Sequence, residues 1–404
     1  MLEAAVIGGG LQGIEITYLA NQAGYRTLLV DKKAQVPARG LADDFFQADM
    51  ACPDRRLLSR LSQSDIIFPA CENFQALIRL DSLRKNLPPI ILDLAAYQLS
   101  SSKEKSKEFF RKAGLPCARD WREVERNEGA ERAEEDEIED GAEGAGFPLI
   151  VKPVEGSGSE DVRLITSREE LNALEAKPGD GTIIAEEYLQ GPTYSLEVIA
   201  YRNQIYPLKI TRLFFDQQYD CRQVVAGGSV PNEVCRELID IGKRAARDLN
   251  LTGIMDLEVI AAESGLKLLE IDARFPSQTP SAVYQAWGIN MVKILVELYL
   301  ELYPENQSRE FYSTGTGAVC GAAIYEQLLV QDQQVFCTGE HIMTEAGLLR
   351  QQNNFFGADI ALTDYRPGSR EWRAILHYKG DSIKGVKKKR KETLDKINSL
   401  VERG

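Results

Sequence analysis

The chain has 404 residues, of which 44% are hydrophobic and 27% charged, and its net charge is −13. This balance is typical of a globular protein of enzyme size with two to four structural units, and it excludes a fibrous or wholly disordered chain. No apolar run reaches the roughly 18 residues that a membrane span needs, and the first residues lack a secretory signal, so we expect a cytoplasmic protein. The seven cysteines show no CxxC spacing, so we expect neither a disulfide framework nor a zinc site.

Most of the negative charge lies in one segment. Residues 123–143 hold eleven acids and two arginines, which leaves a net charge of only −4 for the rest of the chain. The composition of this segment predicts a solvated insertion at 120–146 without a binding role. The basic run "KGVKKKRK" leads into apolar residues at helical spacing, so we interpret it as the solvated face of a last helix. We expect no nucleic-acid or membrane partner, and a monomer or homodimer.

The first 93 residues predict a Rossmann-like domain. Strand-like runs "AAVIG", "TLLVD", "DIIFPA" and "PIILD" alternate with helical stretches such as residues 11–23. This alternation is typical of a parallel α/β unit, in which helices connect neighbouring strands and cover the sheet.

A glycine-rich turn follows the first strand. In "IGGGLQG" three glycines stand in GxGxxG register, and Asp31 closes the next strand, which is the dinucleotide-binding fingerprint. A nicotinamide-dependent oxidoreductase is therefore one alternative, although neither of the two histidines indicates a hydride-transfer site. Whether this loop, with Leu11, Gln12 and Asp31, binds a second nucleotide, shapes a substrate pocket or only turns the chain stays open.

Residues 94–182 predict a smaller α+β unit. It begins with the helical stretch "SSKEKSKEFFRKAG" and continues, after the acidic insertion, with the strand "FPLIVKP", a Gly/Ser loop and the strand "VRLIT". Residues 183–302 predict a unit with strands "TIIAEEYL", "TYSLEVIA", "QIYPLKI", "GIMDLEVIAA" and "LKLLEID". The gap "AESG" between the last two has hairpin size, so we expect antiparallel pairing. Residues 303–404 are mixed in pattern and show no candidate chemistry.

A lysine and a Gly/Ser loop favour a phosphate site in the second unit. Lys152 ends the strand "LIVKP", and Ser157 and Gly158 lie in the loop "VEGSGSEDV" that follows. A strand-borne lysine supplies charge, and small residues let backbone N–H groups approach a triphosphate. The next strand ends in "AEEYLQG", which can present side chains and a backbone edge to adenine through Glu186, Glu187 and Leu189.

Carboxylates at two strand ends favour a metal site. Asp256 lies in "GIMDLEV", and Glu270 and Asp272 lie on the following strand, so a hairpin would bring the three together. Clustered carboxylates repel one another unless a cation joins them, and Mg²⁺ prefers oxygen ligands. Arg274 adds a fixed fork of donors that suits a transferring phosphoryl group.

Taken in order, the strand-borne lysine, the Gly/Ser loop, the E-E-x-L stretch, the acid on one strand and E-x-D-x-R on the next resemble the ATP-grasp superfamily of carboxylate ligases. The stretches "LEIDARFPSQTPSAVY", "GIMDLEVI", "YDCRQVV", "YSLEVI", "SSKEKSKEFF" and "GGGLQGIE" further resemble the ligases that join 3-methylornithine to lysine in pyrrolysine biosynthesis. The resemblance covers most of the chain. It implies an α/β protein with a Rossmann-like pre-ATP-grasp domain, an ATP-grasp α+β module and a C-terminal α+β portion.

The resemblance also implies roles for individual residues. Nucleotide phosphates would be held by Lys103 and Lys152, with Ser157 and Gly158 in the loop, and adenine by Glu186, Glu187 and Leu189. Mg²⁺ would be held by Asp256, Glu270 and Asp272, and Arg274 and Glu270 would be catalytic. The amino-acid substrates would meet Arg274, Ser277, Gln278 and Thr279, with Glu72 near the lysine amine and further contacts from Tyr219 and Asp220.

The implied reaction depends on ATP and Mg²⁺. The γ-phosphoryl group would be transferred to the carboxylate of (3R)-3-methyl-D-ornithine, or of D-ornithine, and the side-chain amine of L-lysine would displace phosphate from the acylphosphate. Another ATP-grasp amino-acid ligase, for example of the D-alanine type, is the main alternative, because it would use the same nucleotide chemistry with a different pocket.

Overall fold

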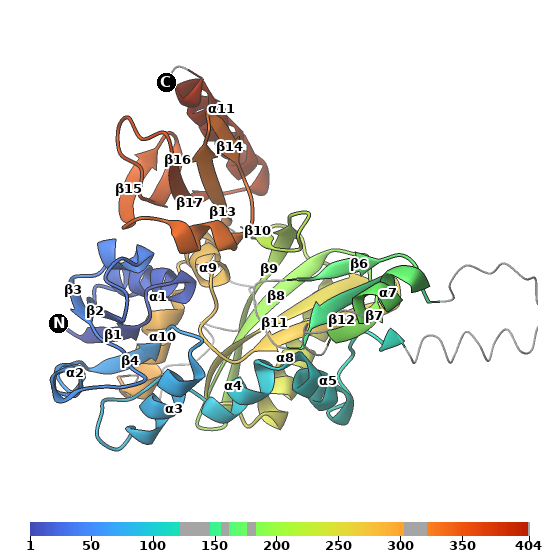
Figure 1. Ribbon diagram of the computed structural model, residues 1–404, viewed down its shortest axis with the longest axis horizontal. Coiled ribbons are helices and arrows are strands. Elements are labelled where there is room, and N and C mark those ends of the chain that lie inside the picture. Colours follow the sequence, from blue (N-terminus) through green and yellow to red (C-terminus); the bar gives the residue numbers. More distant parts are fainter. Residues whose placement is uncertain (122–145, 155–160, 176–182, 303–320, 403–404) are drawn as a thin grey trace, which may run out of the picture.

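The structure, a computed structural model, describes residues 1–121, 146–154, 161–175, 183–302 and 321–402, which form three sheets with helices packed on them (Figure 1). Ser157, Gly158 and nearly all of the predicted acidic insertion lie outside the described residues. Among the helices that are described, none combines the length and the apolar character that crossing a membrane requires.

The first sheet is parallel and has the strand order β3-β2-β1-β4. Its inner strand β1, "EAAVI", is buried at four of five positions, as expected of a parallel strand covered on both faces. The predicted run "PIILD" is not a strand, because Ile90 makes only an isolated bridge to Ile67. The bounds are β1 (Glu3–Ile7), β2 (Arg26–Asp31), β3 (Asp44–Gln47) and β4 (Ile66–Pro69).

The helices of this first unit have identifiable starts. The side chains of Asp54, Asn73 and Asp93 each accept a hydrogen bond from a backbone N–H in the first turn of α2, α3 and α4. Helix α1 follows the glycine turn, where a Cβ on Gly13 would lie 2.1 Å from the carbonyl oxygen of Gly8. The bounds are α1 (Leu11–Gln22), η1 (Pro37–Gly40), α2 (Arg55–Leu61), α3 (Phe74–Ser82) and α4 (Leu94–Ser100).

A three-stranded antiparallel sheet has the order β6-β5-β7. Its register pairs Lys152 with Ile184 and Ile150 with Glu186, so the lysine and the glutamate lie on one face. The N–H of Lys103 donates to the carbonyl of Val154 (3.0 Å), which ties α5 to the end of β5. The bounds are α5 (Lys103–Lys112), β5 (Leu149–Pro153), β6 (Arg163–Ile165), α7 (Arg168–Glu175) and β7 (Ile183–Glu187).

The largest sheet is antiparallel and has the order β12-β11-β8-β9-β10-β13-β17-β16-β15, with β14 paired to β13. Because β10 pairs with β13, the C-terminal strands continue the sheet of the central unit. The bounds are β8 (Thr193–Tyr201), β9 (Gln204–Phe215), β10 (Cys221–Ala226), β11 (Gly253–Ala262), β12 (Gly265–Asp272), β13 (Ala322–Gln331), β14 (Gln334–Phe336), β15 (Arg350–Phe355), β16 (Ala358–Thr363) and β17 (Trp372–Gly380).

The predicted antiparallel hairpin is confirmed as β11–β12. Its turn pairs Ala262 with Gly265, but a bulge next to Glu258 shifts the register, so that Glu258 faces Glu270. Without this extra residue the turn would place Glu270 opposite Leu257, on the other face of the hairpin. The bulge therefore brings the acidic side chains of both strands to one face.

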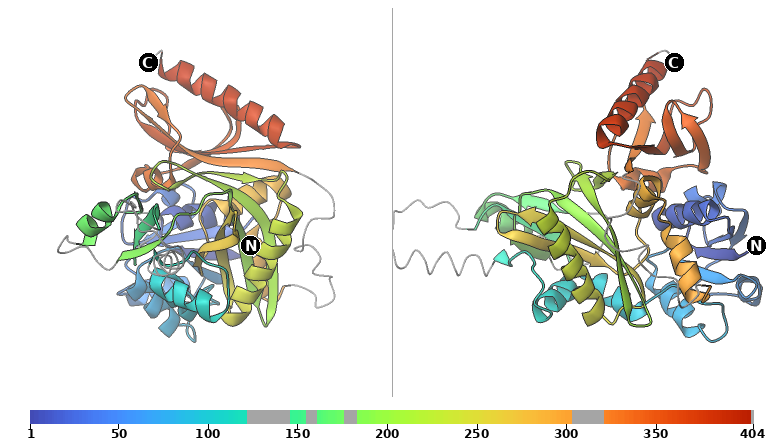
Figure 2. Two further views of the ribbon diagram at one scale, coloured as in Figure 1. Left: turned by 90° about the vertical axis from the view of Figure 1, so that its right-hand side faces the viewer. Right: turned by 180° about the vertical axis from the view of Figure 1, so that it is seen from behind.

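Helices connect the three parts of the molecule. Helix α8 covers β8, β9 and β11, α9 lies between α1 and the strands of the largest sheet, and α10 packs against α1 (Figures 1 and 2). Val6, Ile294 and Tyr325, from the first unit, α10 and β13, belong to one hydrophobic core. The bounds are α8 (Asn232–Asp248), α9 (Thr279–Trp287), α10 (Met291–Tyr299), η3 (Glu340–Glu345) and α11 (Ile383–Val401).

The prediction for the basic run is met by the described residues. The basic run near the C-terminus lies on α11, with Lys387 and Lys388 exposed, Lys389 paired with Asp359, and Val386 buried in the core of the C-terminal strands. The six cysteines among the described residues are all free.

Candidate functional site

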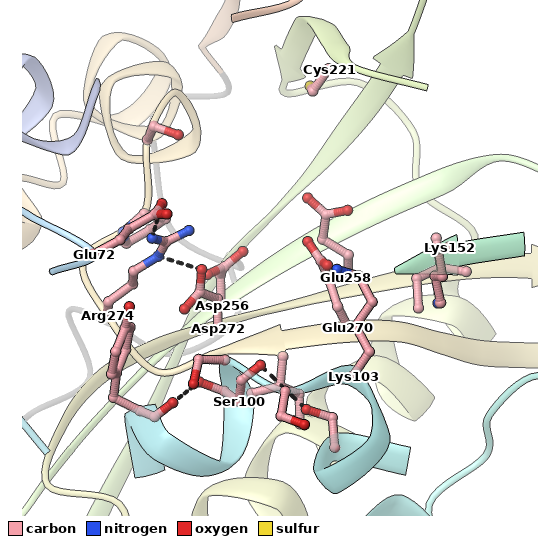
Figure 3. Close-up of a pocket in the computed structure, with 18 of the residues that line it drawn as sticks. Glu72, Ser100, Lys103, Lys152, Cys221, Asp256, Glu258, Glu270, Asp272 and Arg274 are labelled. Carbon is pink, nitrogen blue, oxygen red and sulfur yellow. Dashed lines mark hydrogen bonds and ion pairs between the residues drawn. The ribbon is translucent and has the colours of Figure 1, made fainter. Parts of the chain in front are cut away.

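A cleft of about 650 Å³ opens between the first unit and the two antiparallel sheets (Figure 3). It is lined by residues of α4, α5, β5, β7, β11 and β12, by the segment that follows β12, and by η3. Its volume lies within the usual range for small-molecule sites. The charges that line it are divided between a basic end and an acidic end.

The basic end is built around one buried glutamate. Glu186 lies 2.9 Å from the ammonium nitrogen of Lys107 and 2.8 Å from that of Lys152, and all three side chains are at most 13% exposed. Burial by itself raises the pKa of Glu186, but the two lysines lower it below the ordinary value. Lys103 lines the same end, and burial lowers its pKa. This end of the cleft is therefore suited to phosphate oxygens.

Four carboxylates form two cross-strand pairs on the floor of the cleft. Asp256 faces Asp272, and Glu258 faces Glu270, and the second pair lies nearer Lys103 and Lys152 (Figure 3). Burial, together with the neighbouring carboxylates, raises the pKa values of Asp256 and Glu258 well above their ordinary values. Four acids on one face would repel one another, so the floor is suited to a cation.

The described residues hold no ready-made cage for such a cation. No three of their histidine, cysteine, aspartate or glutamate side chains gather closely enough to bind a metal ion by themselves. Mg²⁺, however, keeps several water ligands and is often held by one or two carboxylates together with substrate phosphates. A single carboxylate pair beside a phosphate site is thus compatible with this ion.

Arg274 connects the floor to the first unit. Its guanidinium pairs with Asp272 on one side and with Glu72 on the other (Figure 3). The amide oxygen of Gln12, in the orientation that satisfies its hydrogen bonds, accepts from Nη1 (2.8 Å) and Nε (3.1 Å) of the same side chain. Burial opposes the charge of Arg274, but the two carboxylates raise its pKa above the ordinary value. The positively charged guanidinium of Arg274 is therefore held in place within the cleft.

The acidic end contains a residue from the C-terminal portion. Glu340 accepts hydrogen bonds from Ser277 Oγ and Gln278 Nε2, both at 2.7 Å, and burial raises its pKa. Asp220 also lines this end, and its carboxylate pairs with His341 and accepts from the backbone N–H of that residue (3.2 Å). The residues predicted to contact the amino-acid substrates, Ser277 to Thr279 and Asp220, thus lie close together around Glu340.

The structure brings the following predicted residues to the cleft: Lys103, Lys152, Glu186, Gln12, Glu72, Asp220, Asp256, Glu270, Asp272, Arg274, Ser277, Gln278 and Thr279. Glu187, Leu189 and Tyr219 do not line it. The Glu187 carboxylate points to the other face of β7, where it accepts from the N–H and Nε of Arg119, both at 2.8 Å. Roles for these three residues in adenine and substrate binding remain predictions.

The glycine turn of the first unit is held by hydrogen bonds to Asp31. Asp31 accepts from the N–H of Gly9 and of Lys33, both at 2.8 Å, so its carboxylate holds the turn itself. Leu11 packs against the hydrophobic core, and neither it nor Asp31 lines the cleft. The cleft does not place either residue where a bound nucleotide would lie, so their contact with a nucleotide remains a prediction.

Lys107, Glu258 and Glu340 are among the residues that line the cleft but were not predicted from the sequence. Helical spacing places Lys107 one turn after Lys103 on the same face of α5, and strand alternation places Glu258 on the face of Asp256, so both were detectable. Glu340 carries no local signal. The histidines are not part of the cleft lining: His341 is half exposed, and His377 is buried against Tyr18 and Tyr325.

Comparison with known proteins gives a consistent result. Residues 100–278 match the ATP-grasp domain family. The chain is 35% identical over 302 residues to the 3-methyl-D-ornithine--L-lysine ligase of Methanosarcina acetivorans, covering 74% of each chain. It is 33% identical over 341 residues to the ligase of the same name from Methanosarcina mazei, covering 84% of this chain and 81% of the relative.

A solved structure shows the same fold. The carboxyaminoimidazole ribonucleotide synthase of Aspergillus clavatus, complexed with ATP, superposes with a TM-score of 0.66 over all of this chain and 98% of that chain, at 16% identity. The predicted α/β architecture with an ATP-grasp module is therefore confirmed.

Proposed function

The chain belongs to the family of the 3-methyl-D-ornithine--L-lysine ligases and is an ATP-dependent carboxylate–amine ligase, and we propose that it joins a D-ornithine-type diamino acid to L-lysine. The carboxylate of (3R)-3-methyl-D-ornithine would be coupled to the side-chain amine of lysine, as a step of pyrrolysine biosynthesis. ATP would be converted to ADP and phosphate.

The observation that carries this proposal is the division of charge in the cleft. The basic end, with Lys103, Lys107 and Lys152, suits a triphosphate, whereas the acidic end, with Asp220 and Glu340, suits an ammonium group. A diamino acid carries two ammonium groups and one carboxylate, so it would turn its amines to the acidic end and its carboxylate toward Arg274. A donor such as D-alanine has no second amine to use this end.

We assign the nucleotide phosphates to Lys103 and Lys152. Lys107 and Glu186 would hold Lys152 in place, since Glu186 lies between the two lysines. Ser157 and Gly158, which lie outside the described residues, remain predictions for the phosphates. Glu187 and Leu189 remain predictions for the adenine, and the Glu187 carboxylate is bonded to Arg119 on the other face of β7.

We assign Mg²⁺ to Glu258 and Glu270, which face each other nearest to the lysines. The raised pKa of Glu258 supports this assignment, because a divalent cation would relieve the repulsion between the paired carboxylates. When bound, Mg²⁺ would neutralise phosphate charge during phosphoryl transfer. Asp256 and Asp272 remain predicted ligands, although Asp272 is already paired with Arg274.

The chemistry would proceed in two steps. First, a carboxylate oxygen of the donor attacks the γ-phosphorus of ATP, ADP leaves, and Arg274 stabilises the charge on the transferring group. Second, the neutral side-chain amine of lysine attacks the acyl carbon, phosphate leaves with that carboxylate oxygen, and the amine loses its second proton. The lysine amine has an ordinary pKa of about 10.4, so it must first be deprotonated, and Glu72, next to Arg274, is the nearest candidate base from the first unit.

An isotope experiment tests both steps. The protein is incubated with ATP, Mg²⁺, L-lysine and D-ornithine or 3-methyl-D-ornithine labelled with ¹⁸O in its carboxylate, and the products are analysed by mass spectrometry. We expect a dipeptide-like product joined through the lysine side chain, and one ¹⁸O atom in the released phosphate. Equal product formation from D-alanine would favour the D-alanine type of ligase, and phosphate without label would exclude the acylphosphate route.

A variant of the acidic end tests the recognition of the diamino acid. Glu340→Gln should raise the KM for D-ornithine about tenfold or more while leaving the KM for ATP within about twofold, because one charged contact is worth about 1.5–3 kcal/mol. Glu345→Gln, on the same element but 76% exposed, is the matched control and should change neither constant. Equal effects of the two variants on the KM for D-ornithine would show that Glu340 does not bind the donor.

A further inference from the structure

A strained turn lies at the acidic end of the cleft. Gln278 has φ 72° and ψ −60°, and the N–H of Thr279 donates to the carbonyl of Ser277 (2.8 Å). This is the γ-turn conformation that non-glycine residues rarely adopt, and such strain persists only where the surroundings hold it. Gln278 and Thr279 are 4% and 5% exposed, so buried contacts must impose the conformation.

Two buried acidic side chains, from distant parts of the chain, hold this turn and the start of the helix that follows it. Glu340 of η3 accepts from the side chains of Ser277 and Gln278, as described above. Glu15 of α1, which is 1% exposed, accepts from the backbone N–H of Ser281 at 2.5 Å. Ser281 lies in the first turn of α9, which begins at Thr279, so Glu15 satisfies one of the free N–H groups at the start of that helix.

Helix α1 also contacts the second half of α9 and the N-cap of α10. Gln285 Nε2 donates to the hydroxyl of Tyr18 (2.6 Å), and Asn290 Nδ2 donates to the carbonyl of Leu19 (2.7 Å). Gln12, one turn before Glu15, contacts Arg274. Helix α1 therefore contacts both the guanidinium of Arg274, through Gln12, and the start of α9, through Glu15.

We infer that Glu15 is a positioning residue of the ligase: by anchoring the start of α9 it keeps the turn at Ser277–Thr279 in the shape that receives the donor amino acid. The inference rests on the proposed function, because that proposal assigns this turn to the donor. Glu15 touches no reacting atom, and its effect passes through Ser281 and Gln278.

The surroundings of Glu15 predict a particular pH dependence. Burial raises its pKa to about 8, and Glu340 of η3 and Glu197 of β8 add to the rise. Burial raises the pKa of Glu197 itself to about 7. Tyr18 of the same helix and Tyr325 of β13 also lie near Glu15, and burial raises the pKa of both, so both are neutral in this range. Glu15 is therefore protonated at pH 7, and a negative charge appears beside the turn as the pH rises through 8.

Three variants separate positioning from stability. Glu15→Ala removes the acceptor, whereas Glu15→Gln keeps an acceptor of the same size that cannot ionise. Tyr18→Phe is the matched control, since it breaks the other side-chain contact between α1 and α9 about two turns from the strained residue. For each we would measure kcat and the KM values for donor, lysine and ATP from pH 6.5 to 9, and amide hydrogen exchange at residues 279–283.

Glu15→Ala should raise the KM for the donor about tenfold, with the KM for ATP within about twofold, and speed exchange at 279–283. Glu15→Gln should match the wild type at pH 7 and lack the rise in donor KM that the wild type shows above pH 8. Tyr18→Phe should lower thermal stability without changing the ratio of the KM values. The inference is overturned if Glu15→Ala changes all three KM values equally, or if Glu15→Gln and the wild type share one pH profile.

Two readouts keep this inference separable from the proposed function. If no diamino acid is ligated by the wild type, the proposed function fails, whereas faster exchange at 279–283 in Glu15→Ala still supports the anchoring of the turn. If Glu15→Ala does not fold, the pH profile of Glu15→Gln decides the question, because that substitution keeps both the size and the acceptor of the side chain.

Discussion

Glu186 lies between two lysines, and its removal should be costly. In Glu186→Gln the shape of the side chain is kept, but two buried ammonium groups lose the carboxylate that lies 2.8–2.9 Å from each of them. Removing one partner of a buried ion pair costs about 3–5 kcal/mol, because the remaining charge stays desolvated. We therefore expect Glu186→Gln to lower the free energy of unfolding by about 3–5 kcal/mol in the absence of nucleotide.

The next residue provides the control. Glu187 lies on the opposite face of β7 and pairs with Arg119, and because the Arg119 side chain is 52% exposed and the Glu187 side chain 14%, solvent reaches this pair from the arginine side. Exposed pairs contribute about 1 kcal/mol or less, so Glu187→Gln should cost no more than that. Denaturation by urea, followed by circular dichroism, measures both variants, and equal losses for the two neighbours would refute the reasoning.

The pH dependence of the same contact gives a second readout. The pKa of Glu186 is lowered in the folded protein from an ordinary value of 4.5. Its stabilising contribution is then fully present above pH 4.5 and is lost as the pH falls through the lowered pKa. The difference in stability between the wild type and Glu186→Gln should shrink only in that acidic range.

Three further changes have definite expected outcomes. Arg274→Lys removes the planar fork that meets two carboxylates and should lower kcat by about 10²–10³, measured by ADP release, while thermal stability distinguishes a folding defect. Glu258→Gln should weaken Mg²⁺ activation, so that half-maximal rate requires a higher Mg²⁺ concentration. An unchanged Mg²⁺ titration would show that Glu258 is not a metal ligand. Gly13→Ala should cost about 1–3 kcal/mol, because the new Cβ meets a backbone oxygen at 2.1 Å, whereas Gly10→Ala, with no atom within 4 Å, should be neutral in thermal unfolding.

The acidic floor shows what local sequence can predict. The gap "AESG" and the alternation of β11 and β12 identify a hairpin, and the acids at its open end indicate a metal site. The spacing along the chain does not reveal the bulge beside Glu258, which decides that the acids of both strands share a face. The sequence pattern therefore groups Asp256 with Glu270 and Asp272, whereas the structure also places Glu258 opposite Glu270. An inserted residue changes register through contacts that the local pattern does not encode.

The ends of the cleft show what local sequence cannot predict. Glu340 and Glu15 reach the same turn from positions more than 300 residues apart, and no motif surrounds either of them. Only the packing of α1, α9 and η3 brings them together. By contrast, the separation of Glu186 from Glu187 follows from the two-residue period of a strand, and that period would have assigned only one of them to the cleft.

The pairing of β10 with β13 has a consequence for synthesis. Gln223 and Glu326, opposite each other in these strands, are separated by 103 residues. At about 5–20 residues per second, a ribosome needs about 5–20 s to deliver β13 after β10 has emerged. During that interval the edge of β10 offers unpaired N–H and C=O groups to any other nascent chain. Truncation before β13, which begins at Ala322, would make this exposure permanent, so pairing with β13 protects the edge of β10 against aggregation.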